Sequence, residues 1–326
     1  LTHYFSSRRG AVVNTTIAMY SHAVLRKRTD HRITVGSLDL KQTLEAENLD
    51  AALKHQGPFG LILALLRAIH PEFGFELYIN SDFPVKSGLG GSAAVSAAIL
   101  GCFNQFRQDR WDLHEISELA FQAERFYLGI SGGWQDQYAT VFGGFNFMEF
   151  GMEETVVTPL RVHADTLLEL EESLVLCDTG IAHESGNIHD HQRVSMQREE
   201  IRGLVEESVN LTYRLRNQLL RGQLLAFGQS LDEAWQIKRR LTGEISSEWL
   251  DSRYDSAIMR GAVGGKLLGA GGGGFFLFYV PPFRRHQFVA DLSELSMHAR
   301  AIRFEERGLQ AWTVREDRQN SEQDGR

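Results

Sequence analysis

Three glycine-rich stretches and two acidic residues are the parts of this sequence whose types and spacing could do chemistry. The first stretch, 84–94, joins an apolar segment, 74–80, to a run of small residues that begins at Ser92. A glycine-rich turn that opens a helix leaves backbone N–H groups unpaired, and the helix dipole favours negative charge there. The pattern is therefore typical of an anion site, although a helix cap beside a tight turn has the same composition.

Two carboxylates follow this stretch at positions where they could act on a bound phosphate. Glu124 lies at the edge of an apolar helical stripe. A carboxylate there is either solvated or salt-bridged, or it completes the shell of Mg²⁺, which takes few protein oxygens beside those of phosphates. Asp136 follows the double glycine 132–133, where another backbone can approach closely. It either complements a helix dipole or orients and deprotonates an acceptor hydroxyl.

Two familiar nucleotide motifs can be tested against the glycine spacing. The P-loop string does not occur, because Lys266 follows a double glycine but precedes Leu267 instead of serine or threonine. The dinucleotide pattern G-x-G-x-x-G/A matches at 88–93 and at 269–274. The first match lacks a strand directly before it and an acidic strand end after it, and the second runs into a strand instead of a helix. The P-loop is therefore excluded, and dinucleotide binding is disfavoured.

The composition excludes several classes of protein. The chain has 326 residues, 43% hydrophobic and 23% charged, which is enough for two domains with their own cores. A net charge of −8 disfavours nucleic acid as a partner. The longest apolar run, 59–66, is too short to span a bilayer, and the sequence has no signal peptide pattern, so we expect no membrane partner and a cytoplasmic location. Cys102 and Cys177 lie in apolar segments and are predicted to be buried thiols.

The elements that must position these residues follow from hydrophobic periodicity and capping signals. The pair Asp112 and Glu115 predicts a capping box at the start of one helix. The other predicted helices are 58–69, 92–106, 189–223, 224–241 and 255–263. The predicted strands are 10–17, 21–26, 31–35, 74–80, 148–150, 156–162, 173–177 and 275–280. An acidic connection is expected over 167–172.

The first and third glycine stretches resemble motifs of the GHMP kinases, the superfamily of galactokinase, homoserine kinase, mevalonate kinase and phosphomevalonate kinase. Residues 84–93 resemble its P-x-x-x-G-L-G-S-S-A motif, which cradles ATP phosphates, with Gly91 in place of the first serine. Residues 266–274, KLLGAGGGG, resemble its third motif. The resemblance implies an ATP site formed by Pro84, Lys86, Ser87, Gly88, Leu89, Gly90, Gly91, Ser92 and Ala93.

The segment 123–150 narrows the resemblance, which covers nearly the whole chain. It is similar to the D-glycero-D-manno-heptose 7-phosphate kinases, which usually read G-G-K-Q-D-Q-Y-A and F-G-G-F-N-F-M-E-F here. The similarity implies that Ser92 and Glu124 bind Mg²⁺ and that Asp136 is the catalytic aspartate. Trp134 replaces the usual lysine, which leaves one cation fewer near the expected site.

The resemblance implies an α+β fold of two domains, with 1–168 like the second domain of ribosomal protein S5 and 169–326 ferredoxin-like. The implied reaction transfers the γ-phosphoryl group of ATP, with Mg²⁺, to the anomeric hydroxyl of a heptose 7-phosphate, for nucleotide-activated heptose and surface polysaccharide. The alternatives are another GHMP kinase, for fucose, galactose or mevalonate, and a non-catalytic sensor of nucleotide and sugar. The two carboxylates favour an enzyme. The oligomeric state is open, with a homodimer among the alternatives.

The acceptor or its phosphates are expected to contact residues on several segments. These are Gly132, Gly133, Gln135, Thr179, Gly180, His183, Lys266, Gly271, Gly272 and Gly273. The alternative for Lys266 is that its stem only packs under the glycine turn that follows. A phosphate on the acceptor would need cations, and the candidates are Arg8, Arg9, Lys86 and Arg193.

The N-terminus is expected to lack an element of the family. Members begin with a strand and a loop of the type P-x-R-I-S-F-x-G-G-G-T-D, followed by a helix and a segment like 10–17. We expect the full gene product to start about 15–25 residues earlier. The 326 residues alone are predicted to be unstable or weakly active.

Overall fold

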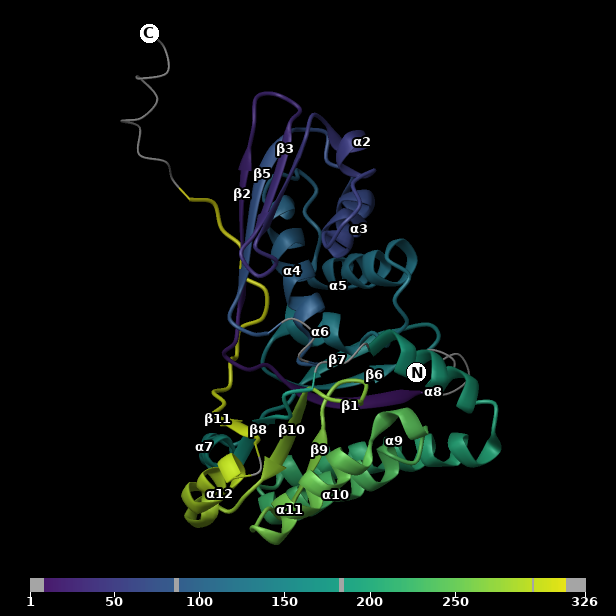
Figure 1. Cartoon of the computed structure of the whole chain (residues 1–326), viewed down its shortest axis with the longest axis vertical. Helices are drawn as coiled ribbons and strands as arrows, with labels where there is room; N and C mark the ends of the chain where they lie inside the picture. Colours follow the sequence, from purple (N-terminus) through teal and green to yellow (C-terminus); the bar gives the residue numbers. More distant parts are fainter. Residues whose placement is uncertain (1–8, 85–87, 182–184, 295, 315–326) are drawn as a thin grey trace.

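The computed structural model describes residues 9–84, 88–181, 185–294 and 296–314, and only the backbone of 185–187. The molecule is elongated (Figure 1): one end carries a four-stranded sheet with helices on one face, and the other carries a second four-stranded sheet with helices. A three-stranded sheet lies between them. The mixture of helices and strands confirms the predicted α+β class.

The strands of the described residues form three sheets, with the orders β1-β6-β7, β2-β5-β3-β4 and β11-β8-β10-β9. Every neighbouring pair is antiparallel except β3 with β5. The strands are β1 Gly10–Thr15, β2 Ser21–Lys27, β3 Ile33–Ser37, β4 Gln42–Ala46, β5 Phe75–Ser81, β6 Phe145–Phe150, β7 Thr155–Pro159, β8 Leu174–Asp178, β9 Gly264–Leu267, β10 Phe275–Tyr279 and β11 His298–Arg300.

The helices include the predicted one with a capping box, in which Asp112 and Glu115 each bond the other's backbone. The α-helices are α2 Leu49–Ala52, α3 Gly60–Ile69, α4 Gly91–Asn104, α5 Leu113–Gln122, α6 Gln135–Phe142, α7 Ala164–Ser173, α8 Ser185–Ser195, α9 Glu199–Leu220, α10 Leu224–Lys238, α11 Glu248–Met259 and α12 Pro282–Glu294. A π-helical turn, η1 Ala123–Tyr127, extends α5, and η2 Gly243–Ile245 is a 3₁₀ turn. No helix in these ranges combines the length and the apolar composition of a membrane span.

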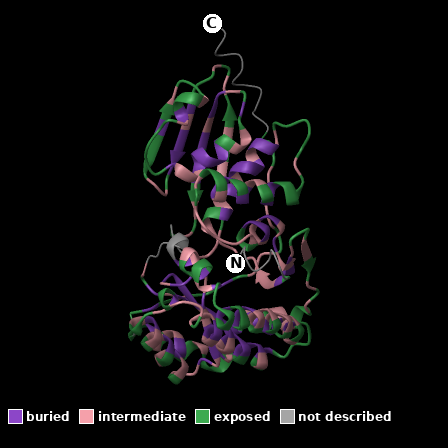
Figure 2. Cartoon of the chain, turned by 90° about the vertical axis from the view of Figure 1, so that its right-hand side faces the viewer, coloured by how far each residue is buried: buried purple, intermediate pink, exposed green. Residues whose placement is uncertain are grey.

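The sheet β2-β5-β3-β4 and the helices α3, α4 and α5 enclose the first hydrophobic core. Helix α3 is apolar nearly all round, as its sequence indicated, and Ile62–Leu66 are buried. Helix α4 carries small residues such as Ala93 and Ala97, which let it approach β2 closely. In Figure 2 the buried residues gather between this sheet and its helices, while the outer face of the sheet is largely exposed. This packing fixes the direction of α4 and the place of its N-terminus.

The sheet β1-β6-β7 lies between the two ends and is covered on both faces. Tyr138 of α6 packs with Met148 and Phe150 on one face. On the other face the Phe147 ring meets Tyr213 of α9, with ring centroids 5.1 Å apart. The middle sheet therefore ties α6 to the helices of the second end.

The sheet β11-β8-β10-β9 has the ferredoxin-like order that was predicted for the C-terminal part. Strand β10 is buried on both faces, which explains its unbroken apolar sequence FFLFY. Phe275 and Tyr279 belong to one core cluster, and Phe276 and Phe278 to another. Cys177 is buried on the neighbouring strand, whereas Cys102 on α4 is half-buried, and both thiols are free.

The expected acidic connection over 167–172 was wrong, because these residues belong to α7. The helix forms because Leu170 and Ser173 are buried, while the largely covered Glu171 and the exposed Glu172 pair with arginines. The single helix predicted over 189–223 was also wrong. It breaks after α8, where the chain turns to bury Met196 before α9 begins. The division of the chain at 168 stays a prediction.

The residues after β11 return to the first end of the molecule as an extended segment, 301–314 (Figure 1). Phe304 forms a β-bridge with Ile17, and the Leu309 N–H donates to the carbonyl of Val141 at 3.0 Å. Leu309 also packs into the first core, beside Gly101 of α4. We call residues 301–314 the return segment.

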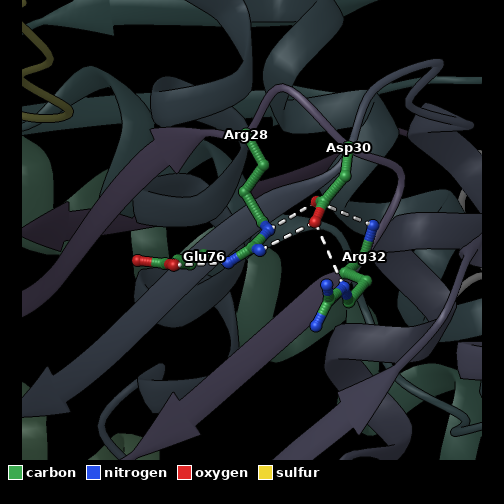
Figure 3. Close-up of polar contacts among 4 residues, drawn as sticks. All are labelled: Arg28, Asp30, Arg32 and Glu76. Atoms are coloured by element: carbon green, nitrogen blue, oxygen red, sulfur yellow. Dashed lines mark hydrogen bonds and ion pairs between the residues drawn. The ribbon is translucent and has the colours of Figure 1, made fainter. Parts of the chain in front are cut away.

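A polar cluster fastens the connection between β2 and β3 (Figure 3). The Arg28 guanidinium forks onto Asp30 through Nε at 2.6 Å and Nη2 at 2.9 Å, and its Nη1 donates to Glu76 at 2.7 Å. Arg32 pairs with the same Asp30 carboxylate at 3.1 Å. The bonded guanidinium of Arg28 holds the pKa of Asp30 well below its usual range.

Candidate active site

The first glycine stretch forms the entry to α4, as predicted. Gly88 and Gly90 have φ values of +73° and +76°, the left-handed region that favours glycine. Gly90 is the N-cap of α4 and no side chain caps the helix, so the first N–H groups of α4 are left for another acceptor. Leu89 anchors the turn by packing into the second core, and Ala93 is fully buried beneath it.

The edges of this stretch differ from its centre. Pro84 is exposed before the turn, and Lys86 and Ser87 lie outside the described residues. Gly91 is covered by Phe83, because a Cβ at Gly91 would lie 2.7 Å from the Phe83 ring. The described part of the predicted phosphate loop is therefore 88–93, at the N-terminus of a well-packed helix.

Ser92 and Glu124 meet at this helix start. Ser92 Oγ donates to Glu124 Oε1 at 2.8 Å, although the two residues are 32 positions apart. Glu124 is 7% exposed and lies on the π-helical turn η1. A π-helical turn shifts the side chains after it relative to a regular helix, and such turns are frequent at functional sites.

The other Glu124 oxygen is held by one hydrogen bond and one ion pair, from two side chains that the sequence did not single out. Gln137 Nε2 donates to Glu124 Oε2 at 2.7 Å, and Arg125 Nη1 lies 3.2 Å from the same oxygen. Gln137 is almost completely buried in the first turn of α6. These contacts leave Oε1 directed toward Ser92.

Asp136 lies in the first turn of α6, beside the phosphate loop. A Cβ added to Gly90 would lie 3.8 Å from the Asp136 Cβ. Solvent reaches the Asp136 side chain, yet protein surrounds it closely, and the resulting loss of hydration raises its pKa. The negative charge of Glu124 raises this pKa further, and the nearby Arg125 guanidinium opposes the change. Three predicted residues, Ser92, Glu124 and Asp136, thus gather around one helix start.

The third glycine stretch touches the first. Gly269 has a φ of +63°, and a Cβ there would come within 3.1 Å of the Gly88 backbone. A Cβ at Gly271 would lie 2.8 Å from the backbone of Ile245, and one at Gly273 would lie 2.4 Å from the backbone of Ile181. The Gly272 N–H donates to the Ile245 carbonyl at 2.9 Å. The glycines of 269–273 are thus needed for close backbone packing against the first loop and its surroundings.

Two lysines lie behind this stretch. Lys266 is half-buried on β9, and the loss of hydration lowers its pKa. Lys238, which lies in the helix predicted over 224–241, donates to the carbonyls of Leu267 at 2.8 Å and Gly269 at 2.7 Å. Burial, and next the charge of Lys266, lower the pKa of Lys238. Lys238 therefore fixes the third glycine stretch from behind.

The residues predicted to contact the acceptor differ in their burial and in their contacts. Thr179 is buried, and its hydroxyl donates to the Gly274 carbonyl at 2.8 Å, so this side chain fastens the glycine stretch. Gly180 has a φ of +69° with nothing near its Cβ position. Gln135 is exposed at the start of α6, and His183 lies outside the described residues.

The cations predicted to bind a phosphate of the acceptor lie in different parts of the structure. Arg9 pairs with Glu154 on the β6–β7 turn, and Arg8 lies outside the described residues. Arg193 reaches a cavity of about 360 Å³ between the 129–134 turn and α8, where burial lowers the pKa of His189 to about 4. The lining residues are Phe121, Arg125, Phe126, Gly129, Ile130, Ser131, Gly132, Trp134, His189, Arg193 and Met196.

Comparison with known proteins identifies the family. The model of the GHMP kinases N terminal domain matches residues 58–144. The D-glycero-alpha-D-manno-heptose 7-phosphate kinase of Campylobacter jejuni subsp. jejuni is 32% identical over 317 residues, which cover 95% of this chain and 93% of the relative. The chain belongs to the GHMP kinase family.

Solved structures of GHMP kinases have the same arrangement. A D-glycero-D-manno-heptose 1-phosphate kinase from Bacteriodes thetaiotaomicron is 27% identical, with a TM-score of 0.76 over 96% of this chain and 94% of that chain. The galactokinase of Lactococcus lactis complexed with galactose has a TM-score of 0.77 over 94% of this chain and 89% of that chain. At 17% identity, this second likeness shows the fold alone. The two-domain GHMP kinase fold expected from the sequence is confirmed.

Proposed function

We propose that this GHMP kinase transfers the γ-phosphoryl group of ATP to the anomeric hydroxyl of a heptose 7-phosphate. The observation that carries the proposal is the contact of 2.8 Å between Ser92 and Glu124 at the open N-terminus of α4, with Asp136 beside Gly90. A phosphate-binding helix start, two oxygen ligands and a carboxylate with a raised pKa are the parts that phosphoryl transfer to a hydroxyl requires.

The bond changes assign a role to each part. The acceptor oxygen forms a bond to the γ-phosphorus, the bond from that phosphorus to the β–γ bridging oxygen breaks, and ADP leaves. The hydroxyl proton passes to the Asp136 carboxylate, whose raised pKa makes it a better proton acceptor than an ordinary aspartate. Backbone N–H groups of 88–93 hold the phosphates, so the protein acts mainly by positioning and electrostatics.

The residues present fit Mg²⁺. The hydroxyl of Ser92 and Oε1 of Glu124 are hard oxygen donors in contact with each other, which is the donor type that Mg²⁺ prefers. No group of three His, Cys, Asp or Glu side chains gathers elsewhere in the described part of the chain. This agrees with a metal that takes one or two protein ligands and completes its shell with phosphates and water. Bound there, Mg²⁺ would neutralise charge on the transferred phosphate.

The acceptor is proposed from the relatives and from the cavity beside the 129–134 turn. Two relatives are named for heptose phosphates, one for a 7-phosphate and one for a 1-phosphate. The cavity is lined by Arg193, Trp134 and Phe121, and the Arg193 side chain is 59% exposed and forms a long ion pair of 3.7 Å with Asp190. We propose that Arg193 binds the phosphate of the acceptor. Arg9, which pairs with Glu154, is no longer a candidate for this contact.

The test is a coupled assay of ADP release with Mg²⁺ over a panel of acceptors. The panel contains heptose 7-phosphate, heptose 1-phosphate, unphosphorylated heptose, galactose, fucose and mevalonate. We expect the highest kcat/KM for heptose 7-phosphate. Equal turnover of an unphosphorylated sugar would contradict the acceptor, and no ADP release with any acceptor would indicate a sensor.

Arg193→Gln tests the assignment of the phosphate, with Arg202→Gln on the exposed face of α9 as its control. We expect Arg193→Gln to raise KM for the sugar phosphate and to leave KM for ATP unchanged. Cytoplasmic location and a homodimer remain part of the proposal, and light scattering of the purified protein tests the second.

A further inference from the structure

Arg125 is the best-connected side chain near the site that has no role in the reaction proposed above. It follows Glu124 on the π-helical turn η1, and its side chain is 13% exposed. Nη1 donates to the Ile130 carbonyl at 3.0 Å, and Nη2 donates to the Gly133 carbonyl at 3.0 Å. Nη1 also lies 3.2 Å from Glu124 Oε2. One guanidinium thus binds a carboxylate and both ends of a turn.

The turn that Arg125 holds leads directly into α6, which carries Asp136. The first turn of α6 is also joined to Glu124, because Gln137 in that turn donates to the same Oε2 at 2.7 Å. The contacts therefore close a ring from Glu124 through Arg125, the 130–133 turn and the first turn of α6 back to Glu124. Any change in this ring alters the position of Asp136 relative to Ser92 and Glu124.

The guanidinium is enclosed on its remaining sides. Gly132 lies directly against it, since a Cβ there would be 2.3 Å from Arg125 Nη2. The guanidinium carbon is 5.4 Å from the centre of the Phe121 ring, and Trp134 packs on that ring with centroids 4.5 Å apart. Position 132 thus requires a glycine because a side chain there would collide with Arg125. The sequence did not reveal this requirement.

We propose that Arg125 is a positioning residue that sets the distance between the Glu124 carboxylate and Asp136 by clamping the 130–133 turn. The inference rests on the proposed roles of these two carboxylates. It requires the planar fork of arginine, because Nη1 and Nη2 of one rigid plane donate to two different carbonyls while the charge lies beside the carboxylate. Lysine would supply the charge without the two fixed directions.

Two kinds of variant test the clamp from opposite sides. Arg125→Lys keeps the charge and removes the fork. Gly132→Ala keeps Arg125 and displaces it, because the new Cβ needs the space of Nη2, and Gly132 does not have the positive φ that would strain an alanine. We expect both to lower kcat by about 10–100-fold, the scale of a misplacement near 1 Å. KM for ATP should change less than threefold, because the phosphate loop is not touched.

The controls separate positioning from loss of structure. Arg28→Lys removes a guanidinium fork in the remote cluster of Figure 3, and Gly36→Ala places a Cβ 2.8 Å from the Tyr78 ring on the outer sheet. Both should lower the melting temperature and leave kcat per folded molecule unchanged. All rates are divided by the folded fraction from circular dichroism.

A readout without turnover is the emission of Trp134, which follows Gly133 in the clamped turn. It is obtained by subtracting the spectrum of the matching Trp134→Phe protein, because the chain has five tryptophans. We expect this difference spectrum to change in Arg125→Lys and in Gly132→Ala and to stay unchanged in both controls. This measurement needs neither ATP nor acceptor.

The outcomes are distinct. Full kcat in Arg125→Lys, or in Gly132→Ala with a normal Trp134 spectrum, overturns the clamp. If Arg125→Lys does not fold, Gly132→Ala decides alone, and if neither folds, the role of Arg125 is structural and the proposal is wrong. If the parent chain turns over no acceptor, the proposed function fails, and the emission of Trp134 still decides whether Arg125 holds the turn.

Discussion

Asp136, the proposed proton acceptor, shows how the surroundings of one side chain can change its affinity for protons. Crowding by protein and the charge of Glu124 raise its pKa, while Arg125 keeps the rise in check. Gly90 brings the backbone of the phosphate loop against it without a Cβ in between. The carboxylate is thus close to the place where phosphates would bind and has an affinity for protons above that of a free aspartate.

We expect Asp136→Asn to lower kcat by about 100-fold or more, because the amide cannot accept the proton. The Kd for ATP, measured by calorimetry, should stay within threefold of the parent value. The control is Asp165→Asn, which changes an exposed aspartate in the first turn of α7. Equal turnover of Asp136→Asn and the parent protein would remove Asp136 from the mechanism.

The same residue predicts the acid side of the pH profile. Asp136 must be ionised to accept a proton, so activity is lost as the pH falls through its pKa in the folded protein. Because that pKa is raised, the loss should begin at a higher pH than for an ordinary aspartate, whose pKa is about 3.9. The measurement is kcat at saturating substrates from pH 8 downward. A constant kcat down to the pH of unfolding speaks against this assignment.

Sequence reasoning located some residues of the site and missed others for a physical reason. Ser92, Glu124 and Asp136 belong to spaced motifs, and the structure brings all three together. Arg125 and Lys238 were missed because charged residues on helices are usually solvated. Their partners are backbone carbonyls of distant turns, and a carbonyl carries no signal in the sequence.

Among the elements, the contact between the first and third glycine stretches has the most direct consequence for binding. Gly269→Ala introduces a Cβ 3.1 Å from the Gly88 backbone at a φ of +63°. We expect it to cost about 1–2 kcal/mol of stability from the left-handed conformation. It should also raise the Kd for ATP roughly five- to tenfold, about 1 kcal/mol, by displacing the phosphate loop.

Gly222→Ala is the matched control for Gly269→Ala. It has a similar φ of +65° and a similarly close contact, 3.1 Å from the Thr166 hydroxyl, but it follows α9 away from the site. The stability cost should be alike in the two variants, and calorimetry should find a change in ATP affinity only for Gly269→Ala. Equal affinities in both would mean that the two glycine stretches are not coupled.

The β2–β3 connection gives a prediction for stability against pH. The pKa of Asp30 is lowered in the folded protein by its bonds to Arg28, so its contribution is present above the unfolded value of about 3.9 and is lost as the pH falls through the folded value. We expect Asp30→Asn to lower the melting temperature at pH 7, with a difference that shrinks below pH 4. A difference that stays constant to pH 3 would contradict the ion pair.

Element boundaries were predictable where the local signal was strong. The capping box of α5 and the small-residue helix α4 were found from sequence because their signals lie within a few residues. The π-helical turn η1 and helix α7 were not. The π-helical turn has only five residues at the end of α5, too few to show a period of their own, and the four acidic residues of α7 conceal Leu170, its one fully buried leucine.

At the scale of the whole molecule, the return segment joins the two ends of the molecule. We expect Leu309→Ala to lower the free energy of unfolding by about 1–2 kcal/mol, less than for a fully buried leucine, because Leu309 is only partly buried. Urea unfolding followed by circular dichroism measures the change, with Leu168→Ala on the exposed side of α7 as control. A smaller loss for Leu309→Ala than for the control would mean that the return segment adds no stability.

The return segment also has a consequence for the order in which the protein is made. Helix α4 and the sheet β2-β5-β3-β4 leave the ribosome long before residues 301–314 are translated. Domains fold as they emerge, N-terminal part first. During that interval the surface of α4 around Gly101 and the carbonyl of Val141 lack the partners that Leu309 later supplies. The first end of the molecule is therefore incompletely covered until a segment that is translated much later packs against it.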